Sequence, residues 1–297
     1  MFAITQDVFG GPEVLRLAEV ERPTPSAGEL LVRVAATSVN AADWKLRSGE
    51  IRKMGEPPFT LGFDVSGVVA QLGAGVDRFA VGGEVYSMVF SRSGAYAEYV
   101  VVPAEFAAAK PKTLDHPHAA ALPTAVLTAW QAFTNVLPGQ RILIHAAAGG
   151  VGHLAVQIAK YHGAHVIGTA SGAKHEFLRG LGADELIDYR TADFTEVTGD
   201  IDIVFDLVGG EYGSRSLKVL RPGGRLIDAQ GNDAESDPRY ERLYVNPSGA
   251  DLETIADLVD QGVLRPEIDR TLPLAEAAEA HRLSESGQVR GKIVLVP

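Results

Sequence analysis

Residues 142–152 read Ile-Leu-Ile-His-Ala-Ala-Ala-Gly-Gly-Val-Gly, an apolar run that leads into a glycine-rich turn. Against the dinucleotide-binding fingerprint G-x-G-x-x-G, positions 147, 149 and 152 hold Ala, Gly and Gly. Gly149 lets the backbone approach a pyrophosphate, and Gly152 lets a helix pack closely on its strand. The helix N-terminus then offers N–H groups and a positive dipole end to the phosphates. A tight turn without a ligand is the alternative. The residues predicted to hold the dinucleotide here are Ala148, Gly149, Gly150, Val151 and Gly152.

Predicted strands and helices alternate from residue 141 onward. Helices are expected at 151–162 and 174–181, and strands at 141–146, 165–170, 185–188, 201–206 and 224–228. Such alternation indicates a parallel sheet with helices on both faces. We therefore expect a Rossmann-type, doubly wound α/β domain over residues 122–264, which would include a further amphipathic helix at 251–261.

The first third of the chain is rich in predicted β-strands. Strands are expected at 14–20, 30–39, 65–72 and 96–102, separated by glycines and prolines. This pattern favours a barrel-like β domain. A helix over 119–135, with Asp115 as a cap before it, would lead into the second domain. The closing strand 292–296 is expected to return to the first domain, which would then comprise residues 1–121 and 265–297.

Composition limits the partners and the chemistry. The 297 residues suggest about two domains. The net charge of −11 disfavours general nucleic-acid binding. The absence of cysteine excludes disulfides, thiol nucleophiles, iron–sulfur clusters and Cys-ligated zinc. No apolar run reaches the ~20 residues of a membrane span. We therefore expect a cytoplasmic protein that binds neither nucleic acid nor a membrane.

The end of the second α/β strand predicts the kind of cofactor. An NAD site places an acid ~20 residues beyond the first glycine, to bind the ribose 2′-hydroxyl. Here the strand ends without an acid, at Gly168-Thr169-Ala170-Ser171. A hydroxyl and a cation at this edge suit the 2′-phosphate of NADP(H). The predicted contacts are Ser171, Lys174 and Tyr189. The alternative is that Lys174 and the neighbouring Arg190 are ordinary solvated charges.

Two further loops follow predicted strands of the same sheet. Residues 206–210 read Asp-Leu-Val-Gly-Gly and residues 229–231 read Ala-Gln-Gly. Because the carboxyl ends of parallel strands border the cofactor crevice, we expect both loops to face the cofactor. The predicted contacts are Val208, Gly209, Gln230 and Gly231.

Several motifs together resemble one protein family. The motifs lie at residues 38–49, 61–67, 121–123, 127–130, 147–152 and 291–295. In this order they resemble the zinc-free quinone oxidoreductases of the medium-chain dehydrogenase/reductase superfamily, over essentially the whole chain. The resemblance implies a GroES-like β-barrel catalytic domain, a Rossmann domain, an NADPH-filled cleft and usually a homodimer. The expected dimer edge is the strand near 225–229 or the segment just after it.

The same resemblance places Asn40 and Thr128 at the nicotinamide end of the cofactor, as catalytic and cofactor-binding residues. The alternative is that Asn40 bonds local backbone and that Thr128 caps a helix turn. Zinc-dependent relatives have a cysteine ligand where this chain has Asn40, and Gly-His-Glu where it has Gly62-Phe63-Asp64, so no metal site is expected. For Asp43 and Asp64, structural hydrogen bonding is favoured over acid–base roles.

The predicted function is therefore a zinc-independent, NADPH-dependent reductase of quinones or α,β-unsaturated carbonyls, with a small molecule as its partner. Hydride can add to a conjugated system because charge spreads onto a distant oxygen. An NADPH-binding sensor or structural protein, like the crystallin relatives, is the alternative, and a synthase-type enoyl reductase is a third. Solvent and Tyr96 are both open as proton donors. Trp44, Phe63, Phe90 and Tyr96 are either an aromatic pocket wall or plain core.

Overall fold

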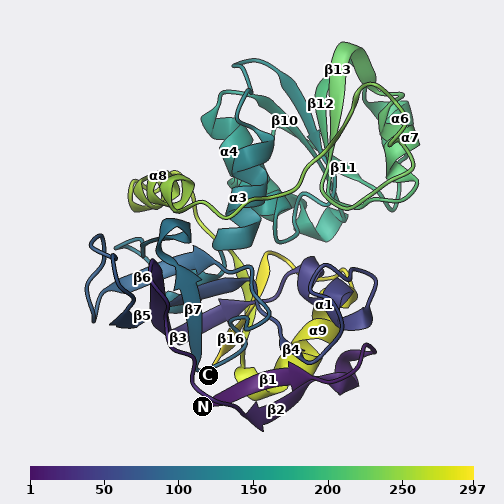
Figure 1. The fold of residues 1–297 in the computed structure, drawn as a ribbon. Helices are drawn as coiled ribbons and strands as arrows, with labels where there is room; N and C mark the ends of the chain where they lie inside the picture. Colours follow the sequence, from purple (N-terminus) through teal and green to yellow (C-terminus); the bar gives the residue numbers. More distant parts are fainter. The chain divides into compact units, whose positions relative to one another are not determined.

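The computed structural model describes residues 1–297, and the chain forms two compact units. Unit 1 comprises Met1–Leu127 and Pro247–Pro297, and unit 2 comprises Thr128–Asn246. Figure 1 shows the chain coloured along the sequence, with the C-terminal strand in yellow beside strands of the N-terminal part. The expected return of the closing strand to the first domain is therefore confirmed.

Unit 1 contains a seven-stranded sheet and a three-stranded sheet. The large sheet runs β15-β16-β3-β5-β6-β8, and β7 pairs with β3. Its strands are β3 (Glu29–Ser38), β5 (Asp64–Leu72), β6 (Glu84–Met88), β7 (Tyr99–Pro103), β8 (Ala107–Ala109), β15 (Ile268–Pro273) and β16 (Lys292–Val296). The small sheet has the order β2-β1-β4, with β1 (Phe2–Gln6), β2 (Arg16–Glu19) and β4 (Phe59–Thr60). The barrel-like β domain is as predicted, although β1, β4, β6, β8 and β15 were not expected from the sequence.

The helices of unit 1 lie around these sheets. They are α1 (Ala41–Ser48), α2 (His116–Ala120), α8 (Gly249–Asp260) and α9 (Ala277–Glu285), with short 3-10 turns η1 (Pro12–Val14), η2 (Ala104–Phe106) and η4 (Leu274–Glu276). Two predicted strands begin later than expected. The segment 14–20 forms a strand only from Arg16, because Pro12–Val14 is a 3-10 turn, and the segment 96–102 forms one only from Tyr99.

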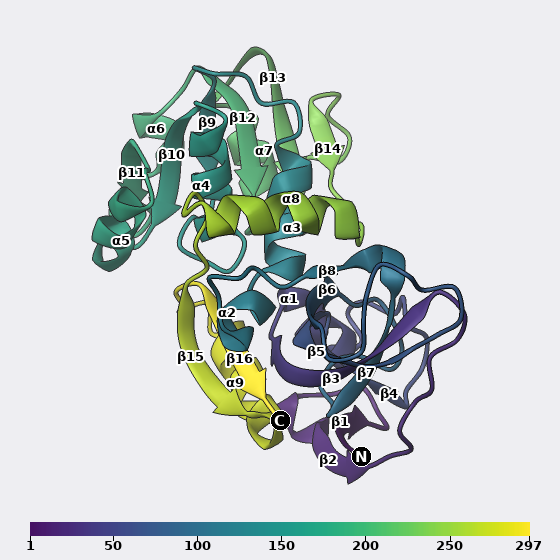
Figure 2. The ribbon, with the colours of Figure 1, turned by 90° about the vertical axis from the view of Figure 1, so that its left-hand side faces the viewer.

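Unit 2 is a six-stranded parallel sheet in the order β11-β10-β9-β12-β13-β14. This is the strand order of dinucleotide-binding Rossmann domains. The strands are β9 (Arg141–Ile144), β10 (His165–Ala170), β11 (Glu185–Asp188), β12 (Ile201–Asp206), β13 (Leu220–Asp228) and β14 (Tyr240–Arg242). The helical segments are α4 (Gly152–Tyr161), η3 (Gly172–Lys174), α5 (His175–Gly180), α6 (Phe194–Val197) and α7 (Tyr212–Ser216). Figure 2 shows β11 and β14 at opposite edges of this sheet.

Three expectations need correction. The predicted helix 119–135 is two helices, α2 and α3 (Pro123–Ala132), because Pro123 has no N–H for a hydrogen bond to an earlier carbonyl and begins the second helix instead. The helix α8, expected in the Rossmann domain, belongs to unit 1. Of the two expected dimer edges, the strand near 225–229 is not a sheet edge, because β13 lies between β12 and β14, whereas the segment just after it contains the edge strand β14.

The packing of α8 explains why the domain boundary at 264/265 differs from the observed division at 246/247. A Cβ added at Gly249 would meet the carbonyl oxygens of Ala107 and Glu105 at 2.5 and 2.6 Å, so the helix starts in contact with η2 and β8. The Tyr86 hydroxyl of β6 donates to the carbonyl of Leu252 at 2.5 Å. These contacts tie α8 to the β domain. No helix of the structure is long and apolar enough to cross a membrane.

Candidate cofactor and substrate site

The turn between β9 and α4 has the geometry that dinucleotide binding requires. A Cβ at Gly152 would meet the carbonyl oxygen of Ala146 at 2.4 Å and Cα of Ala147 at 2.7 Å. Only glycine therefore allows α4 to pack this closely on its strand. The turn is closed by hydrogen bonds from Gly149 N to Ala146 O, 2.9 Å, and from Ala147 N to Thr169 O, 3.0 Å.

The same turn leaves donors free for an anion. The N–H groups of Gly150 and Val151 donate to no protein acceptor, and they lie directly before the first residue of α4. Ten residues of helix place a positive dipole end behind them. Unit 2 thus fits the pyrophosphate of a dinucleotide at Ala148–Gly152, with β9 and β12 forming the topological switch point of the sheet.

Two buried aspartates shape the loops after β12 and β13. Asp206 ends β12, and its Oδ1 accepts hydrogen bonds from the N–H groups of Val208 and Gly209 at 2.9 and 3.0 Å. Asp228 ends β13, and its Oδ1 accepts from Gln230 and Gly231 at 2.7 and 3.0 Å. Each acid folds an Asp-x-x-Gly segment back on itself as an Asx-type turn. Burial raises the pKa of Asp206, while these hydrogen bonds oppose the rise.

These two loops touch each other. Gly209 has φ +84°, and a Cβ there would meet the carbonyl oxygen of Gly231 at 2.7 Å. Gly210 N donates to the same oxygen at 3.0 Å. The four residues predicted here, Val208, Gly209, Gln230 and Gly231, therefore lie together at the carboxyl edge of the sheet. Val208 is 44% exposed, which leaves its side chain open to a ligand.

The edge expected to meet a 2′-phosphate holds the predicted Ser171, Lys174 and Tyr189. Ser171 immediately follows β10, Lys174 ends η3, and Tyr189 follows β11 and is 47% exposed. Ser171 O accepts a hydrogen bond from Lys174 N at 2.8 Å, so the two residues are held in one turn. The predicted trio thus comes from the neighbouring strands β10 and β11 of unit 2.

An acid that the sequence reasoning missed lies at this same edge. Asp188 pairs in register with Ala170, and its Oδ2 accepts from Gly172 N at 2.8 Å. Its Oδ1 accepts from Arg190 N at 3.0 Å, and these backbone donors lower its pKa. The end of β10 carries no acid, as predicted, but this carboxylate of the adjoining strand β11 was not anticipated.

Asn40 is the residue before α1 in unit 1, and its surroundings are buried. Its backbone N–H donates to Asp43 Oδ2 at 2.9 Å, and Asp43 Oδ1 accepts from Gly62 N at 2.8 Å. Asp43 therefore ties α1 to the loop before β5, in agreement with the structural role expected for it. Burial raises the pKa of Asp43 to about 7.

The Asn40 side chain belongs to a buried cluster around Asp64. Asp64 Oδ2 accepts from Ser38 Oγ, from Asn40 Nδ2 at 2.8 Å and from Lys292 Nζ at 3.4 Å. Its Oδ1 accepts from the backbone N–H of Thr124, in the first turn of α3, at 2.7 Å. Lys292 Nζ also donates to Asn40 Oδ1. Asp64 too thus makes the structural hydrogen bonds that were expected of it.

Lys292 is the second residue that the sequence reasoning missed. It is 3% exposed and starts β16. In β16, Val294 pairs antiparallel with Ser38 and Leu295 with Thr37, so the same register places Lys292 opposite Asn40. Burial lowers the pKa of Lys292, and the carboxylate of Asp64 opposes this. Only the strand register, which joins residues 252 positions apart, could have revealed the contact.

This cluster does not suit zinc. The side chains at the expected ligand positions are an amide and a phenyl ring, Asn40 and Phe63. The Lys292 ammonium already takes the two oxygens that a cation would need, one from Asn40 and one from Asp64. No group of three or more His, Asp or Glu side chains in the structure could hold a metal ion.

Thr128 lies in unit 2, within α3, and is 7% exposed. It lies in the interior of that helix, and Asn40 belongs to unit 1. The nicotinamide contacts of Asn40 and Thr128 stay predictions.

The aromatic candidates separate into different environments. Phe63 stacks on Phe90 with ring centroids 5.9 Å apart, and Phe90 is 55% exposed. Tyr96 has no exposed surface, and its hydroxyl lies 3.2 Å from His281 Nε2. Burial and the nearby Asp43 raise the pKa of Tyr96 well above its usual value. Tyr96 is thus a core residue and a poor proton donor, and Phe63, which is 4% exposed, is also a core residue, on which the exposed Phe90 stacks.

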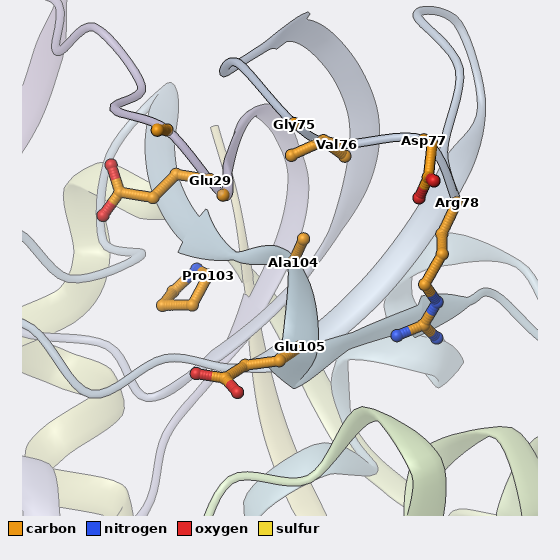
Figure 3. Close-up of a pocket in the computed structure, with 10 residues that line it drawn as sticks. Glu29, Gly75, Val76, Asp77, Arg78, Pro103, Ala104 and Glu105 are labelled. Atoms are coloured by element: carbon orange, nitrogen blue, oxygen red, sulfur yellow. The ribbon is translucent and has the colours of Figure 1, made fainter.

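Unit 1 also has a pocket of about 500 Å³ (Figure 3). Its charged lining is Glu29, Asp77, Glu105 and Arg78. None of the predicted site residues lines it, so it forms no part of the site described here.

Two family profiles match the chain. One, described as the alcohol dehydrogenase GroES-like domain, matches residues 26–112, and the other, described as zinc-binding dehydrogenase, matches residues 181–295. An NADPH-dependent alkenal/one oxidoreductase of Arabidopsis thaliana chloroplasts is 33% identical over 97% of this chain and 78% of its own.

Solved structures agree over the full length. The quinone oxidoreductase of Coxiella burnetii has a TM-score of 0.94 and 38% identity, covering 100% of this chain and 99% of its own. The Escherichia coli quinone oxidoreductase complexed with NADPH has a TM-score of 0.91 and 27% identity, covering 100% of both chains. A GroES-like barrel together with a Rossmann sheet that carries this glycine-rich turn defines a medium-chain dehydrogenase/reductase. Within that superfamily, the chain belongs to the quinone oxidoreductase family.

Proposed function

We propose that this protein is an NADPH-dependent reductase that transfers hydride to quinones or α,β-unsaturated carbonyls without zinc. The observation that carries the proposal is the free N–H pair of Gly150 and Val151 at the start of α4, at the switch point of a parallel sheet. The NADPH-dependent and quinone-reducing relatives support the choice of cofactor and substrate class. The residues of unit 2 described above would hold the dinucleotide, which supplies the hydride.

The proposed reaction balances with one hydride and one proton. Hydride adds to the β-carbon of the enone, the C=C electron pair moves toward the carbonyl, and the resulting enolate takes a proton from water. The products are the saturated carbonyl compound and NADP⁺. Because the buried Tyr96 is a poor acid, we assign the proton to solvent.

Conjugation of the substrate matters because, in this proposal, no Lewis acid polarises the substrate carbonyl. Zinc in alcohol dehydrogenases polarises a carbonyl and stabilises an alkoxide. Hydrogen-bond donors must do this work here, and they suffice where charge can spread over a conjugated system. Asn40 and Thr128 are the proposed donors at the reacting end.

A protein that binds NADPH with little turnover is the second candidate. The observation that favours it is the absence of an exposed acid–base pair, since Asp43, Asp64 and Tyr96 are all fully buried. Both candidates predict tight NADPH binding, but only a reductase oxidises NADPH when an enone is added. Turnover assays with 2-alkenals, 2-alkenones and quinones separate the two. A reductase consumes NADPH and forms the reduced product, whereas a binding protein leaves the NADPH absorbance unchanged.

The cofactor part of the proposal has a matched pair of variants. Gly152→Ala brings a methyl group within 2.4 Å of the Ala146 carbonyl oxygen, so the turn must open. A Cβ at Gly199 of the same unit meets no atom within 4 Å. We expect NADPH affinity, measured by fluorescence titration, to fall at least tenfold in Gly152→Ala and to stay unchanged in Gly199→Ala. Equal affinities in both variants would remove this turn from the cofactor site.

A homodimer and a cytoplasmic location complete the proposal. The lack of cysteine suits a reducing compartment. The edge strand β14 supports dimerisation, because it pairs with only one strand of its own sheet.

A further inference from the structure

We propose that Lys292 is a positioning residue for this reaction: together with Asp64 it fixes the Asn40 amide so that one N–H stays available to the substrate oxygen. The inference rests on the proposed function, because it gives Asn40 the role of donor to the carbonyl. It concerns three side chains of unit 1 that β3, the loop before α1, β5 and β16 bring together.

The chemistry of the two neighbours decides the orientation of the amide. An ammonium only donates hydrogen bonds and a carboxylate only accepts them. The Asn40 oxygen must therefore face Lys292, and the Asn40 nitrogen must face Asp64, as the structure has them. A flipped amide would place its N–H₂ group against the ammonium and its oxygen against the carboxylate.

The cluster leaves one donor unused. Asn40 Nδ2 carries two hydrogens, and one of them is bonded to Asp64. The second donates to no protein acceptor, although Asn40 is only 8% exposed. Ser38 Oγ, Thr124 N and Lys292 Nζ also donate to the Asp64 carboxylate, which itself has no hydrogen to offer a flipped amide oxygen.

Stability alone does not account for the buried pair. Taking an ammonium and a carboxylate out of water costs as much as their attraction returns, so apolar replacements of such pairs are often neutral or stabilising. Lys292 and Asp64 are 3% and 0% exposed. What the pair adds is a fixed amide with a cation bonded to its oxygen, which polarises the remaining N–H toward an acceptor. An oxygen that gains negative charge during hydride addition is such an acceptor.

A double-variant cycle tests this inference. The variants are Asn40→Ala, Lys292→Met and the two combined, and the control is Lys110→Met. Lys110 is another lysine of unit 1, and its side chain is only 7% exposed. It pairs with Glu84 and donates to the carbonyls of Pro111 and Leu114, none of which belongs to the Asn40 cluster. Kinetics with a 2-alkenone give kcat and KM, and fluorescence titration gives the NADPH Kd. Calorimetry with NADP⁺ gives the Kd of the saturated ketone, and thermal unfolding reports the fold.

If Lys292 acts through Asn40, each single variant lowers kcat by about 10- to 100-fold, as for loss of one hydrogen bond to a charged oxygen. The combined variant is then no slower than Asn40→Ala, ketone binding weakens in both singles, and NADPH Kd is unchanged. Lys110→Met keeps full activity. Should Lys292→Met fail to fold, Asp64→Asn/Lys292→Met removes both charges, and the same loss of kcat is expected of it.

Two results would overturn the positioning role alone, and a third would remove Asn40 from the proposed function. A folded Lys292→Met or Asp64→Asn/Lys292→Met with wild-type kcat, beside an impaired Asn40→Ala, overturns the positioning role alone. Losses that multiply in the combined variant do the same, because Lys292 would then act independently. An Asn40→Ala variant with wild-type kcat removes Asn40 from the proposed reaction, and the role of Lys292 falls with it.

Discussion

At the scale of residues, the cofactor preference depends on opposing charges at one edge of the sheet. Ser171, Lys174 and Tyr189 offer a hydroxyl, an ammonium and a phenol around the turn after β10, and Asp188 adds a carboxylate bonded to Gly172. A charge-assisted hydrogen bond to a phosphate contributes roughly 1.5–3 kcal/mol, less where solvent screens it. The preference for NADPH should therefore respond to both charges, in opposite directions.

Lys174→Ala should weaken NADPH binding by about tenfold and leave NADH binding nearly unchanged. The reason is that only NADPH carries the 2′-phosphate, and the effect should shrink at high salt. Titration of both cofactors measures it, with Lys218→Ala, an exposed lysine of the same unit, as the control. Equal weakening of the two cofactors would mean that Lys174 only supports the fold.

Asp188→Asn should have the opposite effect. The variant keeps an oxygen that can accept from Gly172 or Arg190 but removes the negative charge beside the predicted phosphate position. Repulsion across a solvated edge is weak, so NADPH affinity should rise by about a few-fold and NADH affinity should not. Titrations at two salt concentrations check this. A drop in NADPH affinity would show that the carboxylate supports the phosphate-binding turn.

At the scale of elements, the alternation of apolar runs predicted five of the six strands of the Rossmann sheet and the loops that carry its site. The strand β14 escaped notice because three residues leave no periodicity to read. The break at Pro123 could be anticipated from proline chemistry, but the place of α8 depends on packing against η2 and β8. Asp188 and Lys292 could not be predicted as neighbours of the site, because strand pairing and register bring them there.

The edge strand β14 predicts how two copies associate. β14 pairs only with β13, and Tyr244, two residues beyond it, is 61% exposed. An unpaired edge with an exposed aromatic side chain invites pairing with a second copy. Light scattering should give about twice the 31.5 kDa chain mass, and Tyr244→Lys should shift the mass toward one chain.

Tyr161→Lys serves as the control for this prediction. Tyr161 is a tyrosine of the same unit with a similar exposed fraction, 51%, at the end of α4 rather than near the sheet edge. This variant should keep the dimer mass. A wild-type protein that scatters as one chain at micromolar concentration would contradict the predicted dimer.

At the scale of the whole molecule, a buried histidine with a lowered pKa in each unit should make the stability of that unit depend on pH. Burial lowers the pKa of His145 in unit 2 and of His281 in unit 1 to about 3. Between about pH 3 and 6.5 the unfolded chain binds these protons and the folded chain does not, so each histidine makes stability rise with pH in that window. Asp43 in unit 1 acts in the opposite sense. Its pKa is raised to about 7, so its contribution is lost as pH rises from about 4 to 7.

Unit 2 should therefore lose stability on acidification more steeply than its His145→Gln variant does. The two tryptophans report the units separately, since Trp44 lies in unit 1 and Trp130 in unit 2. Denaturant unfolding of a Trp44→Phe protein at pH 4 to 7 follows unit 2 through Trp130 fluorescence. Parallel stability curves for the wild-type and His145→Gln backgrounds would contradict the assignment of the pH dependence to His145.

The central claim, metal-independent hydride transfer from NADPH to a conjugated carbonyl, is tested most directly by an isotope label. Protein treated with a strong chelator is incubated with a 2-alkenone and NADPH that carries deuterium at the transferable position of the nicotinamide. The account predicts undiminished turnover, a saturated ketone with one deuterium at its β-carbon, and no oxidation of saturated alcohols. Loss of turnover on chelation that stoichiometric zinc restores, or a product without deuterium at that carbon, would contradict it.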